Sequence, residues 1–174
     1  MNKQIVLGSG KLYIMDYEFG DEIPTNEIFE TEYNSIGSIS GGASLEHSYD
    51  IMSFYGDSTE EGDRYITNEE VIFKTGILTW NMKNLERLSG AGTLIETDDR
   101  VILKLGEGSS LKKYALRFVH TMKTGKKIRI TLVGTSNGGF ELNFDPENAT
   151  VIDAEFKAIR FNEENTLIII EQEK

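Results

Sequence analysis

Residues 6–14, VLGSGKLYI, contain the residue types that hold a nucleotide phosphate: two glycines, a serine and a lysine. A P-loop requires the pattern G-x-x-x-x-G-K-[ST], in which backbone N–H groups cradle the phosphates and the hydroxyl reaches Mg²⁺. Here Ile5 occupies the place of the first glycine and Leu12 that of the hydroxyl, while the third glycine of a dinucleotide fingerprint would fall on Tyr13. We therefore expect a strand with a glycine kink here, and we predict no nucleotide and no other cofactor.

The acidic stretch GDSTEEGDR, residues 56–64, has oxygen-bearing side chains spaced like the start of an EF-hand loop, at Asp57, Thr59 and Glu61. The twelfth position of that loop is Asn68, which cannot supply the bidentate carboxylate that calcium coordination requires there. No pair of helices is expected around the stretch either. The sequence therefore favours a solvated loop, and we predict no metal site.

Catalytic residue types are present without a catalytic spacing. The two histidines, His47 and His120, fall on apolar-patterned faces of expected strands, which favours a core or interface role over catalysis. The chain has no cysteine and no G-x-S-x-G nucleophile elbow. A pair of carboxylates acting as in a glycosidase remains open, but the pattern singles out no two of the 29 acidic residues. We predict that the chain is not an enzyme.

The composition bounds the class of protein. A chain of 174 residues with 39% hydrophobic residues fits a single domain, residues 1–174, and no apolar run approaches the length of a membrane helix. The net charge of −11, from 18 basic and 29 acidic residues, argues against tight nucleic-acid binding, which requires a basic surface.

Most segments have strand composition, and one segment has the signals of a helix. Over residues 81–89, Asn81 is placed to cap the helix, Met82, Leu85 and Leu88 form one apolar stripe, and Gly90 can end it. The fold predicted is mainly β, a β-sandwich or barrel of two packed sheets with this helix on its flank. The other expected elements are an N-terminal strand, arm and loop over 1–35, strands over 43–51, 70–80, 101–105, 112–122, 127–133 and 140–144, a long loop over 52–68, and a closing hairpin formed by 150–161 and 166–171.

A basic stripe is expected on two neighbouring strands. Two explanations are open: a solvated sheet face, or a surface that meets acidic segments such as 57–63 on another subunit, where edge strands need pairing or protection. The stripe holds six of the 18 positive charges, at Lys113, Arg117, Lys123, Lys126, Lys127 and Arg129.

Three stretches together resemble the major tail tube proteins of long-tailed bacteriophages or prophages. They are GSISGGASLEHSYD, a glycine-rich entry to a strand; EVIFKTGILTWNMKNLERLSGAG, a strand running into a helix; and FELNFDPENATVIDAEFKAIRFNEENTLIIIEQEK, a terminal strand pair. The resemblance covers most of residues 36–172. It implies a β-sandwich with a flanking helix that assembles into stacked homohexameric rings around a channel for viral DNA. The tube proteins of contractile tails and type VI secretion are similar and stay an alternative.

The resemblance also implies partners and surfaces. The partners would be the chain itself and other tail proteins (tape measure, terminator and distal tail proteins), with DNA passing without specific binding and no membrane contact. The protein would occupy the host cytoplasm before assembly and the virion afterwards. Candidate lumen-facing residues are Glu46, Asp50, Glu141 and Glu155. Candidate inter-subunit residues are Phe54, Tyr55, Asp57, Glu60, Glu61, Lys113, Arg117 and Arg129, with loop 52–68 as a candidate inter-ring contact.

An alternative from another class is a β-sandwich binding module for carbohydrate or adhesion. Exposed aromatic residues on a concave sheet would mark such a module, and Tyr114 or Phe140 would serve if they faced outward. A hydrolase that uses two carboxylates is the least favoured alternative.

Overall fold

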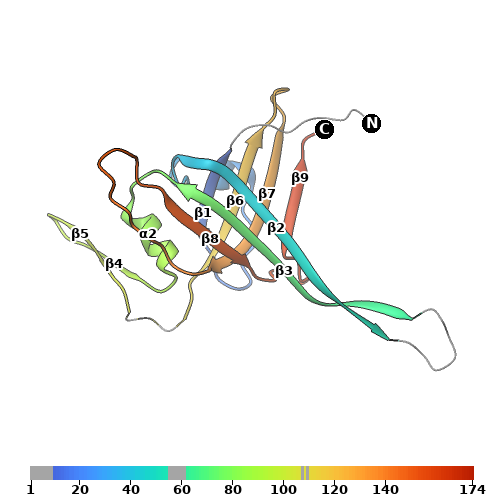
Figure 1. Cartoon of the computed structure of the whole chain (residues 1–174). Helices are drawn as coiled ribbons and strands as arrows, with labels where there is room; N and C mark the ends of the chain where they lie inside the picture. Colours follow the sequence, from blue (N-terminus) through green and yellow to red (C-terminus); the bar gives the residue numbers. More distant parts are fainter. Residues whose placement is uncertain (1–9, 55–61, 107, 109) are drawn as a thin grey trace.

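The computed structural model describes residues 10–54, 62–106, 108 and 110–174, and the chain is mainly β within them (Figure 1). The mainly β class predicted from the sequence is confirmed. The strands are β1 (Lys11–Asp16), β2 (Ile39–Phe54), β3 (Asp63–Ile77), β4 (Thr93–Glu96), β5 (Val101–Lys104), β6 (Lys113–Thr121), β7 (Lys127–Ser136), β8 (Ile152–Ala158) and β9 (Ile168–Gln172). The helices are α1 (Asn26–Phe29) and α2 (Met82–Ser89).

Seven strands form one antiparallel sheet in the order β1-β6-β7-β8-β3-β2, and β9 also pairs with β7. Strand β7 divides this sheet, because its first half pairs with β9 over Ile128–Leu132 and its end pairs with β8 over Gly134–Ser136. The halves β1-β6-β7-β9 and β8-β3-β2 therefore diverge from β7 and run in different directions (Figure 1). Strands β4 and β5 form a separate two-stranded sheet.

One hydrophobic core joins the two halves of the divided sheet. Leu12 and Leu116 come from one half, Phe73 and Phe156 come from the other, and all four belong to the same buried cluster. The rings of Phe73 and Phe118 have centroids 6.0 Å apart. The halves therefore pack face to face as the layers of a β-sandwich do, but hydrogen bonds through β7 join them.

Strand β6 is buried on both faces, because a second layer covers the side of β1-β6-β7 that points away from the main core. Ala115 and Val119 on that side pack with Tyr17 and Phe29 in a second cluster. These two aromatic residues lie on the segment between β1 and β2 that carries α1. Helix α1 thus lies within the N-terminal region where the sequence favours a loop, and it covers this sheet face.

Helix α2 forms where the sequence predicts it. The Asn81 Oδ1 atom accepts a hydrogen bond from the Lys83 backbone N–H at 2.9 Å, and Gly90 ends the helix with φ of 77°. Leu85 and Leu88 are buried in the main core. The Asn84 side chain donates to the Ile36 carbonyl oxygen at 2.9 Å, which fixes the helix against the chain entering β2.

The prediction of a long loop over 52–68 is wrong for residues 52–54 and 63–68, which belong to strands, and residues 55–61 lie outside the described part of the chain. Strand β2 continues to Phe54 and β3 already begins at Asp63, so the two strands form a long hairpin that projects from the body of the molecule (Figure 1). Their pairing runs from Ile39–Ile77 to Phe54–Asp63, with an irregularity between Asp50 and Ile51. We call the part beyond the core, residues 47–54 and 63–69, the arm.

Two expectations for the last third of the chain also need correction. Residues 140–144 do not form a strand, and Phe140 and Leu142 instead pack against the main core from an irregular segment. Strands β8 and β9 do not form a hairpin with one another: β8 pairs with β3 and β7, whereas β9 pairs with β7. A single bridge, Phe161–Thr166, joins the segments that follow β8 and precede β9.

None of the helices in the described ranges has both the length and the apolar character that crossing a membrane requires.

Candidate functional site: an acidic sheet face and a projecting arm

The half-sheet β2-β3-β8 has one face toward the core and one face toward solvent. Directly paired residues share a face, so the core residues Leu45, Phe73 and Phe156 define the inner side. The alternate residues point outward. We call this outer side the acidic face, because it carries five carboxylates and two lysines: Glu46, Asp50, Glu70, Asp153, Glu155, Lys74 and Lys157.

Carboxylates of the same face bind both lysines. Lys74 Nζ lies 3.2 Å from Glu155 Oε2, and Lys157 Nζ pairs with Glu70. Across the part of the chain that the structure describes, no basic side chain lies within salt-bridge distance of Glu46, Asp50 or Asp153. The face therefore keeps an excess of negative charge and offers no unpaired lysine to an incoming phosphate.

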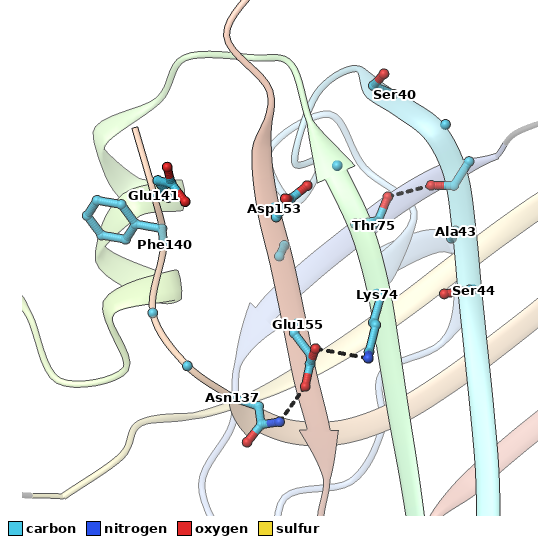
Figure 2. A pocket seen from close by; sticks show the side chains of 16 residues that line it. Ser40, Ala43, Ser44, Lys74, Thr75, Asn137, Phe140, Glu141, Asp153 and Glu155 are labelled. Atoms are coloured by element: carbon cyan, nitrogen blue, oxygen red, sulfur yellow. Dashed lines mark hydrogen bonds and ion pairs between the residues drawn. The ribbon is translucent and has the colours of Figure 1, made fainter. Parts of the chain in front are cut away.

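A pocket of about 630 Å³ lies on the acidic face where β2, β3 and β8 meet the segment after β7 (Figure 2). Figure 2 shows Glu155 between Lys74 and Asn137, with Asp153 further along the same strand. Hydrogen bonds from Asn137 and Lys74 hold the pKa of Glu155 below its usual value, so it stays ionised at neutral pH. The lining is polar and glycine-rich, and Gly138 and Gly139 both have positive φ where the chain turns away from β7.

The four lumen candidates lie on or beside this one face. Glu46 and Asp50 are exposed on β2, and Glu155 is on β8. Glu141 lies on the irregular segment after Gly139, at the rim of the pocket that Glu155 also lines (Figure 2). Pairing of β2 with β3 and of β3 with β8 therefore places Glu46, Asp50 and Glu155, which are far apart in the chain, on one face. Asp153 and Glu70 belong to the same face and were not among the candidates.

The arm exposes apolar side chains on both of its faces. Ile51 pairs with Ile66 and the adjacent pair is Met52–Tyr65, so the two pairs point to opposite sides. Ile66 and Phe54 are 59% and 58% exposed. The rings of Phe54 and Tyr65 contact each other with centroids 5.9 Å apart, but no core residue covers them. Tyr49 is also half exposed, at 50%.

The outer edge of β2 is open. In the described residues β2 pairs only with β3, so the main-chain groups along its other edge have no strand partner. Such an edge is a template for another strand unless it is covered or charged.

The structure contradicts the placement of Arg117 and Arg129 on an exposed, inter-subunit face. Both are buried, at 4% and 7% exposed. Arg117 donates to Thr131 Oγ1 at 3.0 Å and to Asn26 Oδ1 at 2.8 Å, and its guanidinium lies 4.5 Å from the Phe29 ring centroid. The segment with α1 covers this face, so these arginines are contacts within the chain.

The other inter-subunit candidates divide between the arm and the sheet. Phe54 is exposed near the tip of the arm. Lys113 is exposed at the start of β6, with its Nζ 5.8 Å from the Phe19 ring centroid. Tyr55, Asp57, Glu60 and Glu61 lie outside the described residues.

The structure also places the residues that would mark a carbohydrate-binding, catalytic or metal-binding function. Tyr114 is buried, at 1% exposed, which contradicts its role as an exposed sugar-stacking residue, and Phe140 is half-buried beside the pocket. His120 is buried in the body, whereas His47 is exposed on the arm, with Nε2 3.0 Å from Glu69 Oε1. No group of three or more potential metal-ligating side chains gathers in the described part of the chain.

Comparison of the sequence with models of known protein families found no match, and comparison with curated proteins found no significant match.

Proposed function

We propose that this protein is the subunit of a self-assembling tube, in which copies close into rings through the arm and enclose a channel lined by the acidic face. The observation that carries the proposal is the arm. An isolated two-stranded hairpin is marginally stable in water, and this one exposes apolar side chains on both faces and leaves one edge unpaired. A second copy would cover these groups, since exposed apolar patches of this kind mark interaction sites.

The position of the arm favours a ring over a simple dimer. The seven residues of β3 in the arm, 63–69, extend about 20 Å at ~3.3 Å per residue, whereas the rest of β3 packs on the core. The arm therefore projects far enough to contact a different surface of another copy (Figure 1). A contact between an arm and a different surface of the next copy is heterologous, and such contacts close into rings when the rotation permits.

The acidic face supplies the channel lining in this proposal. Duplex DNA carries one negative charge per about 1.7 Å of axis, and lysines or arginines that neutralise its phosphates make it bind. Here Lys74 and Lys157 are already paired with Glu155 and Glu70. A wall built from this face would repel phosphates, so DNA would slide without specific binding.

The finer identity is part of the same proposal: a major tail tube protein of a long-tailed phage or prophage, found in the virion and joined there by other tail proteins. The mainly β architecture with helix α2 on its flank is compatible with it, as it is with the tube of a contractile tail.

The experiment is negative-stain microscopy of the concentrated protein beside an arm variant, Ile51→Thr/Ile66→Thr. These changes keep β-branched side chains in both strands and remove the apolar contact that assembly requires. We expect rings or tubes of uniform width from the wild type and monomers from the variant. The control is Val101→Thr/Leu105→Thr, which alters two exposed apolar residues away from the arm and should leave assembly unchanged.

Size-exclusion chromatography and circular dichroism of the same samples distinguish loss of assembly from loss of folding. A wild-type protein that stays monomeric at high concentration would overturn the proposal. Glycan binding by such a monomer would favour the binding-module alternative.

A further inference from the structure

A groove of about 740 Å³ lies at the end of the molecule where β1 ends and β9 begins. Its lining includes four apolar side chains: Phe19 is 75% exposed, Ile23 and Ile169 are half-buried, and Phe161 is buried. Two chain segments form its walls, residues 19–23 after β1 and residues 161–164 before β9. We call it the polar-end groove.

The charged residues that line the groove are four carboxylates: Asp21, Glu22, Glu163 and Glu164. One lysine lies beside the lining, since Lys113 Nζ is 5.8 Å from the Phe19 ring centroid, and it leaves the groove with an excess of negative charge. All four carboxylates are exposed. Among the ion pairs of the described residues, none involves any of them. An occupant of this groove therefore needs positive charge at its surface and enough apolar stem to contact Phe19 and Ile23. Lysine side chains combine these two properties.

The complementary element on this chain is the turn between β6 and β7. Thr121 pairs with Lys127, and within the turn the Met122 and Lys126 main chains bond at 2.8 Å while the Gly125 N–H donates to the Met122 carbonyl at 2.9 Å. These main-chain bonds hold the turn, and Lys123 and Lys126 are both exposed on it. Neither lysine takes part in a salt bridge with another described residue.

The turn and the groove lie at opposite ends of the same strands. The turn precedes Lys127, the first residue of β7, whereas Ile169, which lines the groove, pairs with Thr131 of the same strand. The Ile159 N–H, two residues before Phe161, bonds to the Val133 carbonyl further along β7. Four to six residues of strand, or about 13 to 20 Å, therefore separate the turn from the groove of its own chain. Each copy carries one turn and one groove.

We propose that the β6–β7 turn of one copy docks into the polar-end groove of a second copy, with Lys123 and Lys126 against Asp21, Glu22, Glu163 and Glu164. The contact is heterologous and repeats from copy to copy along the direction of β6 and β7. In an assembly of the kind proposed above, on which this step rests, it joins one ring to the next, a role distinct from that of the arm. Each contact is exposed and sensitive to salt, and several contacts in one ring act together.

Crosslinking tests the docking without requiring rings. The chain has no cysteine, so Thr124→Cys and Glu163→Cys give two proteins with one thiol each. Both lysines and three of the four carboxylates remain. When the two proteins are mixed with a short bis-maleimide, we expect a crosslinked dimer whose yield falls as salt is raised. The control replaces Thr124→Cys by Asp98→Cys, an exposed site on the β4–β5 turn.

A yield equal to that of the control would overturn the docking, whether or not rings form. Crosslinking at the expected sites in a protein that forms no rings would overturn the tube proposal alone. The two proposals therefore fail separately.

Charge reversal tests the role of the docking in stacking. We expect Lys123→Glu/Lys126→Glu to give single rings in place of tubes, and the added changes Glu163→Lys/Glu164→Lys to restore tubes by exchanging the charges. The control Lys83→Glu/Lys104→Glu changes the net charge equally at other sites and should leave tube length unchanged. Tubes of normal length from the reversed turn, or no restoration by the exchange, would overturn the inference.

Discussion

Arg129 shows how single residues hold the covering layer in place. Its guanidinium group on β7 contacts Glu30 Oε1 at 2.5 Å, just after α1, and Glu173 Oε1 at 2.7 Å, just after β9. Lys127 Nζ reaches the other oxygen of Glu30 at 2.9 Å. The side chains of Arg129 and Glu30 are each 9% exposed, so this ion pair is nearly removed from water. One arginine thus ties the α1 segment and the C-terminal segment to the sheet.

Removing Arg129 should cost far more stability than removing an exposed lysine. In Arg129→Met the Glu30 carboxylate stays buried with only Lys127 beside it, and loss of one partner of a buried pair lowers the free energy of unfolding by about 3 kcal/mol. Urea denaturation measures the change. The comparison is Lys74→Met, whose pair with Glu155 is exposed and should contribute at most about 1 kcal/mol. Equal losses in the two variants would contradict the structural role of the network.

Glu30 should make stability depend on acid pH. Burial raises its pKa, but hydrogen bonds from Arg129 and Lys127 outweigh burial and leave the pKa below the ordinary value of 4.5. A carboxyl group with a lowered pKa in the folded state stabilises the fold above its unfolded pKa, and this stabilisation is lost as pH falls through the folded pKa. We therefore expect the difference in unfolding free energy between wild type and Glu30→Gln to be largest near neutral pH and to shrink below about pH 4.5. Urea titrations across that range measure it, and a difference that stays constant would contradict the assignment.

At the scale of elements, α2 begins at a cap whose contribution can be measured. The Asn81 side chain satisfies the Lys83 N–H, so Asn81→Ala should lower the free energy of unfolding by about 1 kcal/mol. Asn81→Asp keeps the oxygen acceptor and should retain most of the stability. Thermal or urea unfolding of the two variants compares them. An aspartate variant as unstable as the alanine variant would show that the cap hydrogen bond is not the cause.

The helix could be predicted because its signals are local, whereas several strand partners could not. Cap, apolar stripe and terminating glycine all lie between Asn81 and Gly90. The outer part of the arm, residues 52–54 and 63–68, escaped prediction because both of its faces are exposed, so no alternation distinguishes it from a polar loop. Phe140 and Leu142 alternate because they pack on the core from an irregular segment, which gives the pattern of a strand without a strand partner. Strands β8 and β9 were recognised, but their pairing with β7 depends on contacts distant in sequence.

The candidate site was predictable only where local alternation determines which face of a strand a residue occupies. Period-two alternation correctly placed Glu46 and Asp50 on one side of β2, and Glu155 joins them because β8 pairs with β3. The same reasoning failed for Arg117 and Arg129, since nothing in their spacing reveals that the α1 segment covers them. The polar-end groove combines residues 19–23 with residues 161–164, and no local pattern links these segments.

At the scale of the whole molecule, the candidate contact surfaces lie along two different strand directions. The arm projects from one end of β2 and β3, whereas the β6–β7 turn and the polar-end groove lie at opposite ends of β6 and β7. These two strand directions differ because β7 divides the sheet (Figure 1). Copies that associate along both directions would extend around a ring and along a stack. The acidic face would then repeat on every copy as a continuous surface.

The charge of that face provides the last prediction. Glu46→Lys/Asp50→Lys places two unpaired lysines on the acidic face of each copy, where the wild type has no cation at these positions. Because added phosphate contacts strengthen binding and make it salt-dependent, tubes of the variant should retain duplex DNA at low salt and release it as salt rises. Wild-type tubes should retain none, and Asp98→Lys/Glu147→Lys tests the effect of an equal charge change at exposed sites elsewhere. Co-sedimentation of tubes with labelled DNA measures retention. If the control tubes retained as much DNA as the variant, net charge and not the acidic face would govern passage. If wild-type tubes retained DNA at physiological salt, the face could not serve as a repulsive wall.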